Sequence, residues 1–458
     1  MSNNPSLASR FLHSAIFCLA LGYALPESTA AAAETSETGR EETGSTLEDF
    51  FTAAIEFSPQ LRIAEEGLNI GSARRRAANG RLLPQLSAQA SMSDNRQETS
   101  LQNQSFDGNR YSMQLSQVLF SWQAYSARSA AYLVEDQLEA EYYNELGSLL
   151  TEVAGKYFDV LQADDALSSI ASELDAVSNQ LDQIQNLYER QMTQITDLYQ
   201  AQASLAAVEG QQLQLQSELA LAQEALYSVS GLSSDGLYRL KSELTIPPLE
   251  NSITYWVNQA EKNNHLIRAR EFAVRAADKR VDERRGAYMP QVSLIAQRQN
   301  SNLGFQNTLI NDTDTTYLGL DVTIPFYAGG SNKAAVSEAA SQYRIAESEL
   351  RQAQLEASAQ VRAAYLQVQS AQTLIAAAEK LVESATLSST AMQRGFELGA
   401  VTSVDVLNAL RDQFRAERDL QSTRYNHVKY LLLLKRETGL LSAEDMLEVG
   451  TWLEAPGR

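Results

Sequence analysis

The sequence predicts a mainly α-helical protein that also carries a few membrane-type β-strands and consists of two similar halves. Three observations lead to this fold class. The spans 85–246 and 326–455 contain no proline, similar segments recur about 207 residues apart, and short segments alternate between apolar and polar residues. Because proline removes a helix hydrogen bond and clashes with the preceding turn, proline-free spans of this length permit very long helices.

The first 33 residues have the pattern of a secretory signal peptide, which takes no part in a mature fold. Arg10 precedes the apolar run FLHSAIFCLALGYAL, and the small residues Ala30 to Ala33 offer a cleavage site. Cys18 lies inside the run and follows Phe17, so we expect no lipid anchor there. We therefore expect an exported protein whose mature chain has no cysteine and needs no disulfide bond.

The acidic composition and the lack of catalytic patterns exclude several classes of function. A net charge of −20 argues against a nucleic-acid partner, because phosphate contacts need clustered Lys and Arg side chains, and it suits a surface or channel that attracts cations. His265 and His427 stand singly, without metal-ligand spacing, and no phosphate loop or nucleophile elbow occurs. The sequence therefore predicts neither an enzyme nor a cofactor.

Three pairs of similar segments indicate that the chain is duplicated. RLLPQLSAQA at 81–90 resembles AYMPQVSLIA at 287–296, VAGKYFDVLQA at 153–163 resembles VRAAYLQVQSA at 361–371, and YERQMTQITDLYQAQ at 188–202 resembles FELGAVTSVDVLNAL at 396–410. The offset rises only from 206 to 208 along these pairs. Three matches in the same order describe a duplicated half.

The alignment of the strands between these segments follows from side-chain parity. An offset of 207 pairs Tyr111 and Met113 with Leu318 and Leu320, which keeps apolar residues on one face of both strands. An offset of 206 would match Tyr111 with Tyr317, but it would move every side chain to the opposite face. We therefore predict that Tyr111 and Leu318 share a face.

Each half has the same order of parts: a helical segment, a two-stranded hairpin and a pair of long helices. The helical segments cover about 47–80 and 252–284, and the polar segments 93–110 and 300–315 have the composition of the hairpin loops. The parts predicted after the signal peptide are, in order, 34–83 (first helical segment), 84–121 (first membrane hairpin), 122–231 (first long helix pair), 232–289 (linker and second helical segment), 290–327 (second membrane hairpin), 328–440 (second long helix pair) and 441–458 (C-terminal tail).

The second long helix follows its strand almost directly. It begins near Asn332 and runs for about 60 residues, on the order of 90 Å at 1.5 Å per residue. The strand-to-helix joint is FYAGG, where Pro325, Gly329 and Gly330 relax the backbone demands of the change from strand to helix; the first half has FSWQA instead. Narrow stripes of small apolar residues along the long helices are typical of coiled-coil-like packing and not of a globular core.

The strand faces favour passage through a membrane. Even positions from Leu318 to Phe326 are apolar, while Gly319, Asp321 and Thr323 point the other way, as in a membrane barrel with a polar lumen. The aromatic residues that a girdle at the membrane surface would need are Tyr111, Phe120, Trp122, Tyr125, Tyr317 and Tyr327. A sheet with one face on a soluble core is the alternative, but the export signal, the duplication and the lack of a second apolar layer favour the membrane.

Four strands per chain predict an oligomer. No stretch after the N-terminus approaches 18 consecutive apolar residues, so strands would make any passage through a membrane. Four strands cannot close a barrel, and an open edge in lipid leaves backbone groups without hydrogen bonds. Three copies would give about twelve strands and a wide lumen, since about eight strands are filled by their own side chains. The strand count alone leaves the number of copies open.

These parts together resemble a known family. The order PQ-strand, QVLFSW or TIPFYAGG, long helix, ITDLYQAQ or TSVDVLNAL, and TRYNHVKYLLLLKRETGLL resembles the TolC family of bacterial outer-membrane channel proteins from about residue 47 to 445. The resemblance implies a homotrimer with a twelve-stranded barrel in the outer membrane, continuous with an α-helical tunnel across the periplasm. It implies a porin-like exit duct of a tripartite efflux pump or type I secretion system, which passively conducts drugs, small molecules or secreted proteins.

The same resemblance implies the partners of the chain. They are outer-membrane lipid, a periplasmic adaptor (membrane fusion) protein and an inner-membrane transporter of the RND or ABC class, whose docking opens the closed periplasmic end of the tunnel. The alternative is a periplasmic coiled-coil adaptor or a structural surface protein without a pore. An adaptor would have one helical hairpin flanked by compact β domains, whereas this chain predicts two hairpins and no such domains.

The turns between the paired helices are expected to form the closed end. The resemblance places Asp197 and Asp405 at its constriction, where Asp405 from three copies would form a cation-selective ring. A plain helix start is the other interpretation, because Thr402 and Asp405 have the spacing of a capping box and acids are stabilised in a first helical turn. Both interpretations stay open on the sequence.

Three positions of the tip depart from the family pattern. In the family, a tyrosine and an arginine hold the closed end together through the acid that matches Asp197. In this sequence Phe396 and Val401 stand at those two positions, and Asn408 stands where the family has a second acid of the ring. Phenylalanine has no hydroxyl to donate, and valine cannot pair with a carboxylate. We therefore expect other contacts to hold the closed state.

Overall fold

The structure is a computed structural model that describes residues 45–100, 102–241, 248–302 and 312–455. The expected signal peptide, residues 1–33, lies outside the described residues. The first half contains α1 (Leu47–Phe57), α2 (Pro59–Gly80), β1 (Gln85–Thr99), β2 (Gln102–Phe120), α3 (Trp122–Glu189), α4 (Ile195–Ser230) and β3 (Arg239–Leu240). The second half contains α5 (Ile253–Asn263), α6 (His265–Gly286), β4 (Gln291–Asn302), β5 (Thr313–Thr323), α7 (Ser331–Glu397), α8 (Ser403–Glu437), α9 (Ala443–Thr451) and β6 (Leu453–Glu454).

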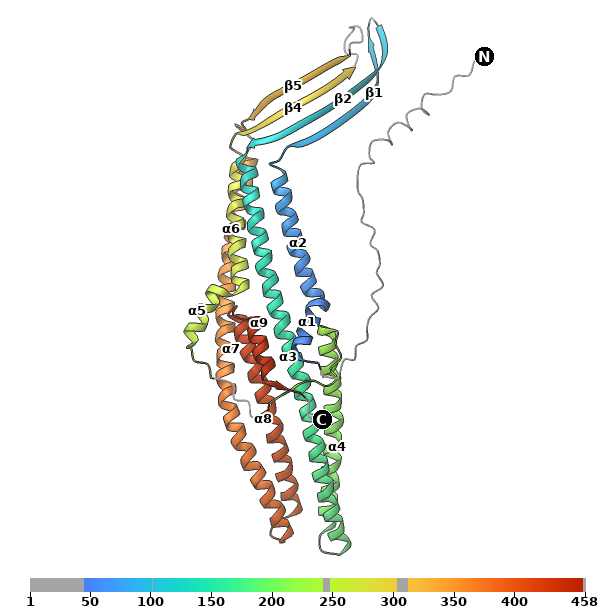
Figure 1. Cartoon of the computed structure of the whole chain (residues 1–458), viewed down its shortest axis with the longest axis vertical. Helices are drawn as coiled ribbons and strands as arrows, with labels where there is room; N and C mark the ends of the chain where they lie inside the picture. The colour runs from blue at the N-terminus through green and yellow to red at the C-terminus, as the bar shows by residue number, and fades with distance from the viewer. Residues whose placement is uncertain (1–44, 101, 242–247, 303–311, 456–458) are drawn as a thin grey trace, which may run out of the picture. The chain divides into compact units, whose positions relative to one another are not determined.

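The four long strands form one antiparallel sheet in the order β1-β2-β4-β5, so β1 and β5 are its edges. Each half contributes one hairpin, as the alternation predicts, and the two hairpins meet where β2 pairs with β4. A β-bulge interrupts this pairing between Val118 and Phe120, just before α3 begins. The sheet lies at one end of the long helices (Figure 1).

The first hairpin loop is much shorter than its composition suggests. The polar segment 93–110 was expected to be a loop, yet β1 reaches Thr99 and β2 starts at Gln102, so most of this segment is paired strand. The prediction is wrong because backbone hydrogen bonds hold the strands together here, and they do not require an apolar face. Residues 303–311 of the second expected loop lie outside the described residues. On either side of them, residues 300–302 belong to β4 and residues 313–315 belong to β5.

The long helices form two hairpins, α3–α4 and α7–α8. With 68 and 67 residues, α3 and α7 are about 100 Å long at 1.5 Å per residue. Next to the sheet α3 packs against α2 and α6, and α6 packs against α7; away from the sheet α3 packs against α4 and α8, and α8 packs against α7 (Figure 1). Among the described helices, none combines enough length with enough apolar residues to span a bilayer as a helix.

Each of the two helical segments predicted over about 47–80 and 252–284 consists of two helices. Ser58 ends α1 and caps α2 by accepting a hydrogen bond from the backbone N–H of Leu61, and Pro59 occupies the first turn of α2. Asn264 caps α6 by accepting from two backbone N–H groups. Ser-Pro and a capping Asn are the signals of a new helix start.

The two strand-to-helix joints are built differently. In the first half only Ser121 separates β2 from α3, and its hydroxyl caps the helix by accepting from the backbone N–H of Ala124. In the second half residues 324–330 form a linker that contains Pro325. Gly329 and Gly330 have φ values of +59° and +83°, the left-handed region that favours glycine, and Gly330 is the N-cap of α7.

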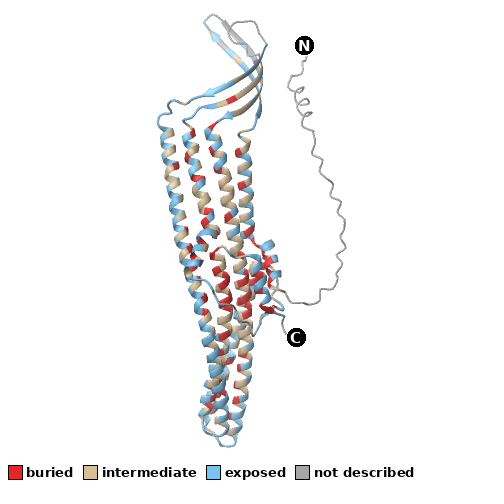
Figure 2. Cartoon of the chain, turned by 60° about the vertical axis from the view of Figure 1, so that its left-hand side comes forward, coloured by how far each residue is buried: buried red, intermediate tan, exposed pale blue. Residues whose placement is uncertain are grey.

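The largest apolar core lies midway along the long helices, where Figure 2 shows the buried residues gathered. Phe50 of α1 meets Tyr157 of α3 edge to face at 5.5 Å, and the Tyr157 hydroxyl donates to the carbonyl oxygen of Tyr238 at 2.9 Å. The C-terminal tail completes this core: α9 and β6 bury Met446, Val449, Trp452 and Leu453, and β6 pairs with β3. Lys435 of α8 holds the tail through Asp445 at 2.6 Å.

We predict that Trp452→Ala lowers the free energy of unfolding by about 3 kcal/mol, because it removes a large aromatic side chain from a packed core. The matched control is Leu447→Ala on α9, which Trp452 directly follows; Leu447 is 52% exposed and the expected change is below about 1 kcal/mol. Denaturant unfolding of the detergent-purified protein, followed by far-UV circular dichroism, measures both. Equal stability of the two variants would contradict the role of the tail in the core.

Candidate functional site

The sheet has one apolar and one polar face over the half next to the helices. Directly paired residues point to the same face, and the register pairs Ala90 with Tyr111 and Ala296 with Leu318. The apolar face comprises Leu86, Ala88, Ala90, Tyr111, Met113, Leu115, Leu294, Ala296, Leu318, Leu320 and Val322. Tyr111 and Leu318 share it, so the predicted side-chain parity is confirmed.

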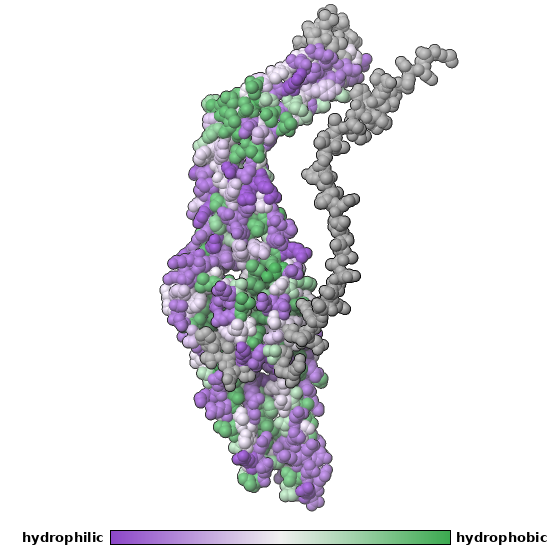
Figure 3. All heavy atoms as spheres, viewed as in Figure 1, coloured by the Kyte–Doolittle hydropathy of each residue, from purple (hydrophilic) through white to green (hydrophobic). Residues whose placement is uncertain are grey.

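Nothing in the described part of the chain covers this apolar face. Leu318 is 73% exposed and Leu320 is 62% exposed, although leucine is among the residues most often buried in proteins. Figure 3 shows hydrophobic side chains gathered at the end of the sheet next to the helices and hydrophilic ones at the far end. At that far end Arg298, Asn300 and Asp314 follow on the same face, and Asp314 accepts a hydrogen bond from Asn300 at 3.2 Å.

Aromatic residues mark both ends of the apolar band. Phe120, Trp122 and Tyr125 lie where β2 passes into α3, and Tyr111 lies nine residues from Phe120 at the other end. Nine residues span about 30 Å of strand, which at a tilt of about 45° is close to the height of a membrane barrel's apolar band, about 25 Å. Tyr317 does not belong to this girdle, which corrects the sequence expectation, because its pairing with Gln297 puts it on the polar face.

The opposite face of the sheet is lined by uncharged polar side chains. It carries Gln85, Ser87, Gln89, Ser112, Gln114, Ser116, Gln297, Gly319 and Thr323, with Asp321 as its charged member in this half of the sheet and with Val118, Ile295 and Tyr317 as exceptions. A sheet that is exposed and apolar on one side and polar on the other matches lipid on one side and water on the other.

At the other end of the molecule, the first hairpin turns between α3 and α4. Asp197 lies in the first turn of α4 and is half-buried. Its carboxylate accepts a hydrogen bond from the Thr193 hydroxyl at 2.6 Å, which links the turn to the helix. Asp197 therefore has a local structural partner within its own hairpin.

The second hairpin turns between α7 and α8, and Asp405 lies in the first turn of α8. The Asp405 carboxylate accepts from the Thr402 hydroxyl at 2.7 Å, and Thr402 accepts from the backbone N–H of Asp405 in return, so the capping box is confirmed. The side chain of Asp405 is exposed, and the hydrogen bonds from Thr402 hold its pKa below the ordinary value of aspartate. Asn408, also exposed, follows one turn later on α8.

Phe396 and Val401, which replace the family's tyrosine and arginine, take different places in the structure. Phe396 packs against an apolar cluster in which Leu407 of α8 joins residues of α3 and α4, so the cluster links the two hairpins through α8. The cluster consists of Ile170, Val177, Ile184, Leu198, Ala201, Val208 and, from α8, Leu407. Val401 lies against Gly395 inside its own turn. The tip contact between the hairpins is therefore apolar.

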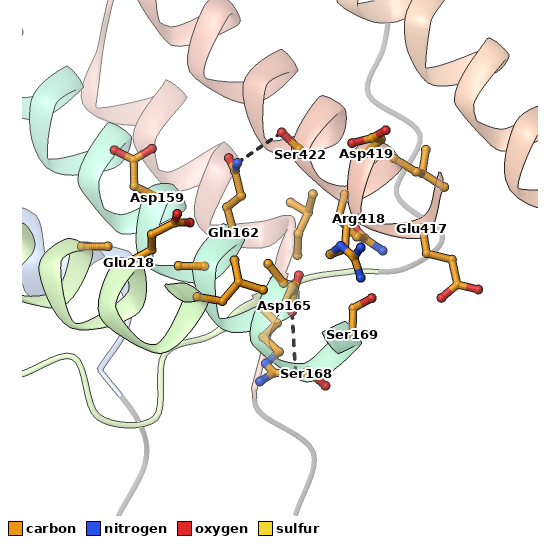
Figure 4. Close-up of a pocket in the computed structure, with 18 of the residues that line it drawn as sticks. Asp159, Gln162, Asp165, Ser168, Ser169, Glu218, Glu417, Arg418, Asp419 and Ser422 are labelled. Carbon is orange, nitrogen blue, oxygen red and sulfur yellow. Dashed lines mark hydrogen bonds and ion pairs between the residues drawn. The ribbon is translucent and has the colours of Figure 1, made fainter. Parts of the chain in front are cut away.

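Farther from the tips the two hairpins are joined by polar contacts between α3 and α8, the seam of the chain. They are Lys429–Asp159 at 2.8 Å, Gln162–Ser422 at 3.2 Å, Tyr425–Asp165 at 2.6 Å and Arg418–Glu173 at 2.7 Å. A cavity of about 980 Å³ lies beside the seam, and residues of α3, α4 and α8 line it (Figure 4). Burial raises the pKa of Asp165, against the lowering influence of the Tyr425 hydroxyl and of Arg239.

The sequence analysis missed this seam, although one signal was present. Buried residues of α3 recur at spacings of three and four, at Ile170, Glu173, Val177, Gln180 and Ile184. Glutamate and glutamine at positions of a coiled-coil stripe usually require a partner, because a buried charge is costly when unpaired. The partner, Arg418, is 245 residues away in the chain, and no local pattern points to it.

Comparison with known proteins agrees with this geometry. The family model "Outer membrane efflux protein" matches two segments of the chain, 51–232 and 256–439, one in each half. The chain belongs to the outer membrane efflux protein family. The resemblance found in the sequence is thereby confirmed, and so are the duplication, the outer-membrane location with an extension into the periplasm, and the class of function, an exit duct for efflux or secretion.

Individual relatives of this efflux family protein are similar along most of their length. The outer membrane protein TolC of Vibrio cholerae serotype O1 is 25% identical over 412 residues, which is 89% of this chain and 94% of the relative. The alkaline protease secretion protein AprF of Pseudomonas aeruginosa is 25% identical over 411 residues, 87% of this chain and 85% of the relative. The crystal structure of VceC from Vibrio cholerae has a TM-score of 0.74 at 19% identity and covers 86% of this chain and 96% of its own.

These matches also bear on the class of the protein. The three relatives are named as outer membrane proteins and as a secretion protein, and none of the names is that of an enzyme. Their similarity extends over both hairpins, which favours the duct over the adaptor alternative.

For the seam of this efflux family protein, we predict that Tyr425→Phe lowers the free energy of unfolding by about 1–2 kcal/mol, because the largely buried Asp165 carboxylate loses a hydrogen-bond donor. The difference in free energy of unfolding between wild type and variant should shrink as the pH falls and Asp165 becomes protonated, since the protonated carboxyl is no longer a buried charge. Thermal unfolding at several pH values measures this. The control, Tyr227→Phe, changes an exposed tyrosine of α4 and should leave stability unaltered.

Proposed function

We propose that three copies of this chain close side by side into a twelve-stranded barrel and a helical tunnel, through which cargo passes from an inner-membrane transporter to the exterior without catalysis by the chain. The uncovered apolar face of the sheet carries this proposal. A β-sheet with this face in lipid has no stable open form, because unpaired backbone groups at its edges cost several kcal/mol each in hydrocarbon. The edge strands β1 and β5 must therefore find partners on other copies.

Each unpaired edge of the sheet lies on the same side of the chain as an outermost helix of the long-helix region. On the side of β1 the outermost helices are α2 and α4, and on the side of β5 the outermost helix is α7 (Figure 1). An interface that joins one edge of a protomer to the opposite edge of the next is heterologous. Such interfaces form a ring when the rotation that relates neighbouring copies adds up to a full turn. The same rotation would then close both the sheet and the layer of helices.

Exposed apolar side chains on these edges support the proposed interface. On α4, Leu213 is 64% exposed and Leu221 is 70% exposed. On α7, exposed leucines recur along a helix length of about 39 Å, at Leu355, Leu366, Leu374 and Leu381. Two narrow apolar stripes on opposite edges suit helix-to-helix packing between neighbouring copies.

In the proposed barrel the polar sheet face lines the lumen. Its Gln, Ser and Thr side chains can both donate and accept hydrogen bonds, and the face has few charges. Such a surface favours the passage of varied cargo without strong binding. This fits a passive duct for drugs, small molecules or secreted proteins.

The partners proposed for the duct follow from the family and from the hairpin tips. The chain is similar to the alkaline protease secretion protein AprF, which supports a place in a secretion or efflux assembly. The tips lie at the end of the helices away from the sheet (Figure 1) and would face an inner-membrane transporter of the RND or ABC class. A periplasmic adaptor protein would join the two around the hairpins.

At the tips we propose that Asp405 from three copies forms a cation-selective ring, with Asp197 and Asn408 nearby at the constriction. The capping box does not prevent this, because the Asp405 carboxylate is exposed while it accepts the Thr402 hydrogen bonds. A ring of three carboxylates favours cations electrostatically.

We predict that the purified wild-type protein conducts ions in planar lipid bilayers and that Leu213→Arg together with Leu221→Arg abolishes both the trimer and the conductance. Two charges in the proposed α4–α7 interface would be buried without partners. Native mass determination in detergent reports the number of copies. The control, Leu447→Arg on α9, should remain a conducting trimer. A conducting single copy, or a wild-type protein that never conducts, would contradict the proposal.

For the proposed ring, we predict that Asp405→Asn weakens block of the channel by multivalent cations. Because the pKa of Asp405 is lowered in the folded protein, the carboxylate stays ionised as the pH falls to about 3.9, the ordinary value, and the wild-type block should fade only below it. The same titration removes the contribution of Asp405 to the start of α8, which is present above that pH and lost as the pH falls through the lowered pKa. Single-channel recording over a pH series measures the block, and unchanged block in the variant would exclude the ring.

A further inference from the structure

The polar contacts of the seam stop part-way to the tips. The contacts run from Asp159–Lys429 down to Glu173–Arg418, and among the described residues no hydrogen bond or ion pair joins α3 or α4 to α7 or α8 closer to the tips. From Glu173 to the end of α3 at Glu189 there are 16 residues, about 24 Å of helix. The last stretch of both hairpins is thus held together differently from the rest.

Glu173 and Arg418 form the most buried ion pair of the seam. The two side chains are 2% and 14% exposed, and the Arg418 Nη1 donates to the Glu173 Oε2 at 2.7 Å. By contrast, the Asp159 side chain of the uppermost pair is 44% exposed. A charge-assisted hydrogen bond is shorter and stronger than one between neutral groups, and here it has a defined geometry. The two helices are therefore joined at this point by a specific contact.

Below this pair the seam contains buried polar atoms that have no hydrogen-bond partner among the described residues. They are the Nε2 of Gln180 on α3 and the Oγ of Ser403 on α8, in residues that are 5% and 3% exposed. Gln180 follows Glu173 by seven residues, two helical turns, so it lies on the same helix face. A buried polar atom without a partner in the protein disfavours the joined arrangement.

The contacts between the hairpins therefore change in kind along the seam. Separating the hairpins below Glu173 exposes the apolar contact of Leu407 but lets water reach the amide of Gln180, which lies on the same face of α3 as Glu173. Separating them at Glu173 breaks a charge-assisted hydrogen bond, one of the strong interactions of proteins.

We propose that the Glu173–Arg418 pair is the hinge at which the two hairpins part, with separation confined to the ends below it. This rests on the proposed function, with a duct whose tips open and close. It places the pair between the part of the hairpins that separates and the part that stays joined. Glu173 and Arg418 act by positioning the helices and do not contact cargo. Gln180 has the opposite effect, since its unpartnered amide favours the open arrangement.

The test uses the purified full-length assembly with spin labels at Met192→Cys and Leu398→Cys, exposed residues at the two tips. Arg418→Met leaves Glu173 without its partner, so the hairpins should part above the pair and the distance distribution between labels should shift to longer values. In bilayers, the occupancy of high-conductance states should rise at least about tenfold, since removing one partner of a buried pair is strongly unfavourable. Gln180→Leu should lower that occupancy.

Two controls separate the hinge from a general effect on stability. Arg415→Met makes the same substitution one turn earlier on α8, where 75% of the side chain is exposed, and should change neither the distances nor the conductance. The exchanged pair Glu173→Arg with Arg418→Glu should restore both toward wild type.

The outcomes distinguish the two proposals. If Arg418→Met lowers the melting temperature but alters tip distances and conductance no more than Arg415→Met, the pair is only structural and the hinge is wrong. If the wild-type assembly does not conduct at all, the proposed duct fails, while the tip distances in Arg418→Met and Gln180→Leu still support or overturn the hinge.

Discussion

The architecture depends on the hydrogen bonds that the edge strands β1 and β5 lack within one chain. The sheet exposes an apolar face over the height of a bilayer, so its edges would lie in hydrocarbon, where an unpaired backbone group is far more costly than in water. In the proposed assembly, the requirement for edge pairing sets the direction in which copies associate. The exposed leucines of the outer helices α4 and α7 fit that assembly, because helices attached to a ring of strands would be brought together by the same rotation.

The segments between the strands and the long helices connect the sheet to the rest of the molecule. In the first half a single residue, Ser121, separates β2 from α3, so the direction of the strand determines that of the helix. The second half uses the longer linker 324–330 with two left-handed glycines. The two joints therefore differ in length and backbone conformation, although the sequence is repeated. The core around Tyr157, closed by the C-terminal tail, then holds both halves together midway.

Periodicity in the sequence predicted much of this fold because its signals are local. Alternation located the hairpins, and parity put Tyr111 and Leu318 on one face. It failed where backbone pairing prevails over composition, since the polar segment 93–110 is strand, and it did not separate the helices that Ser58 and Asn264 each start. Tyr317 was placed in the girdle from its type, but its register puts it on the polar face. Contacts distant in sequence, such as Glu173 with Arg418 and the tail with the core, have no local signal and require the structure.

The two ends of the protein face opposite physical demands, and they use different interactions to meet them. In the proposed duct, closure of the sheet is permanent, because the loss of backbone hydrogen bonds in lipid has no compensation. Closure of the tips would be reversible in that proposal, and there the structure has an apolar contact at Leu407, an Asp405 carboxylate that accepts hydrogen bonds within its own turn, and buried polar atoms that water could satisfy instead. In water these groups exchange one set of partners for another at small net cost. The buried ion pair of Glu173 with Arg418 lies between the two regions, where the proposed hinge would separate the permanent arrangement from the reversible one.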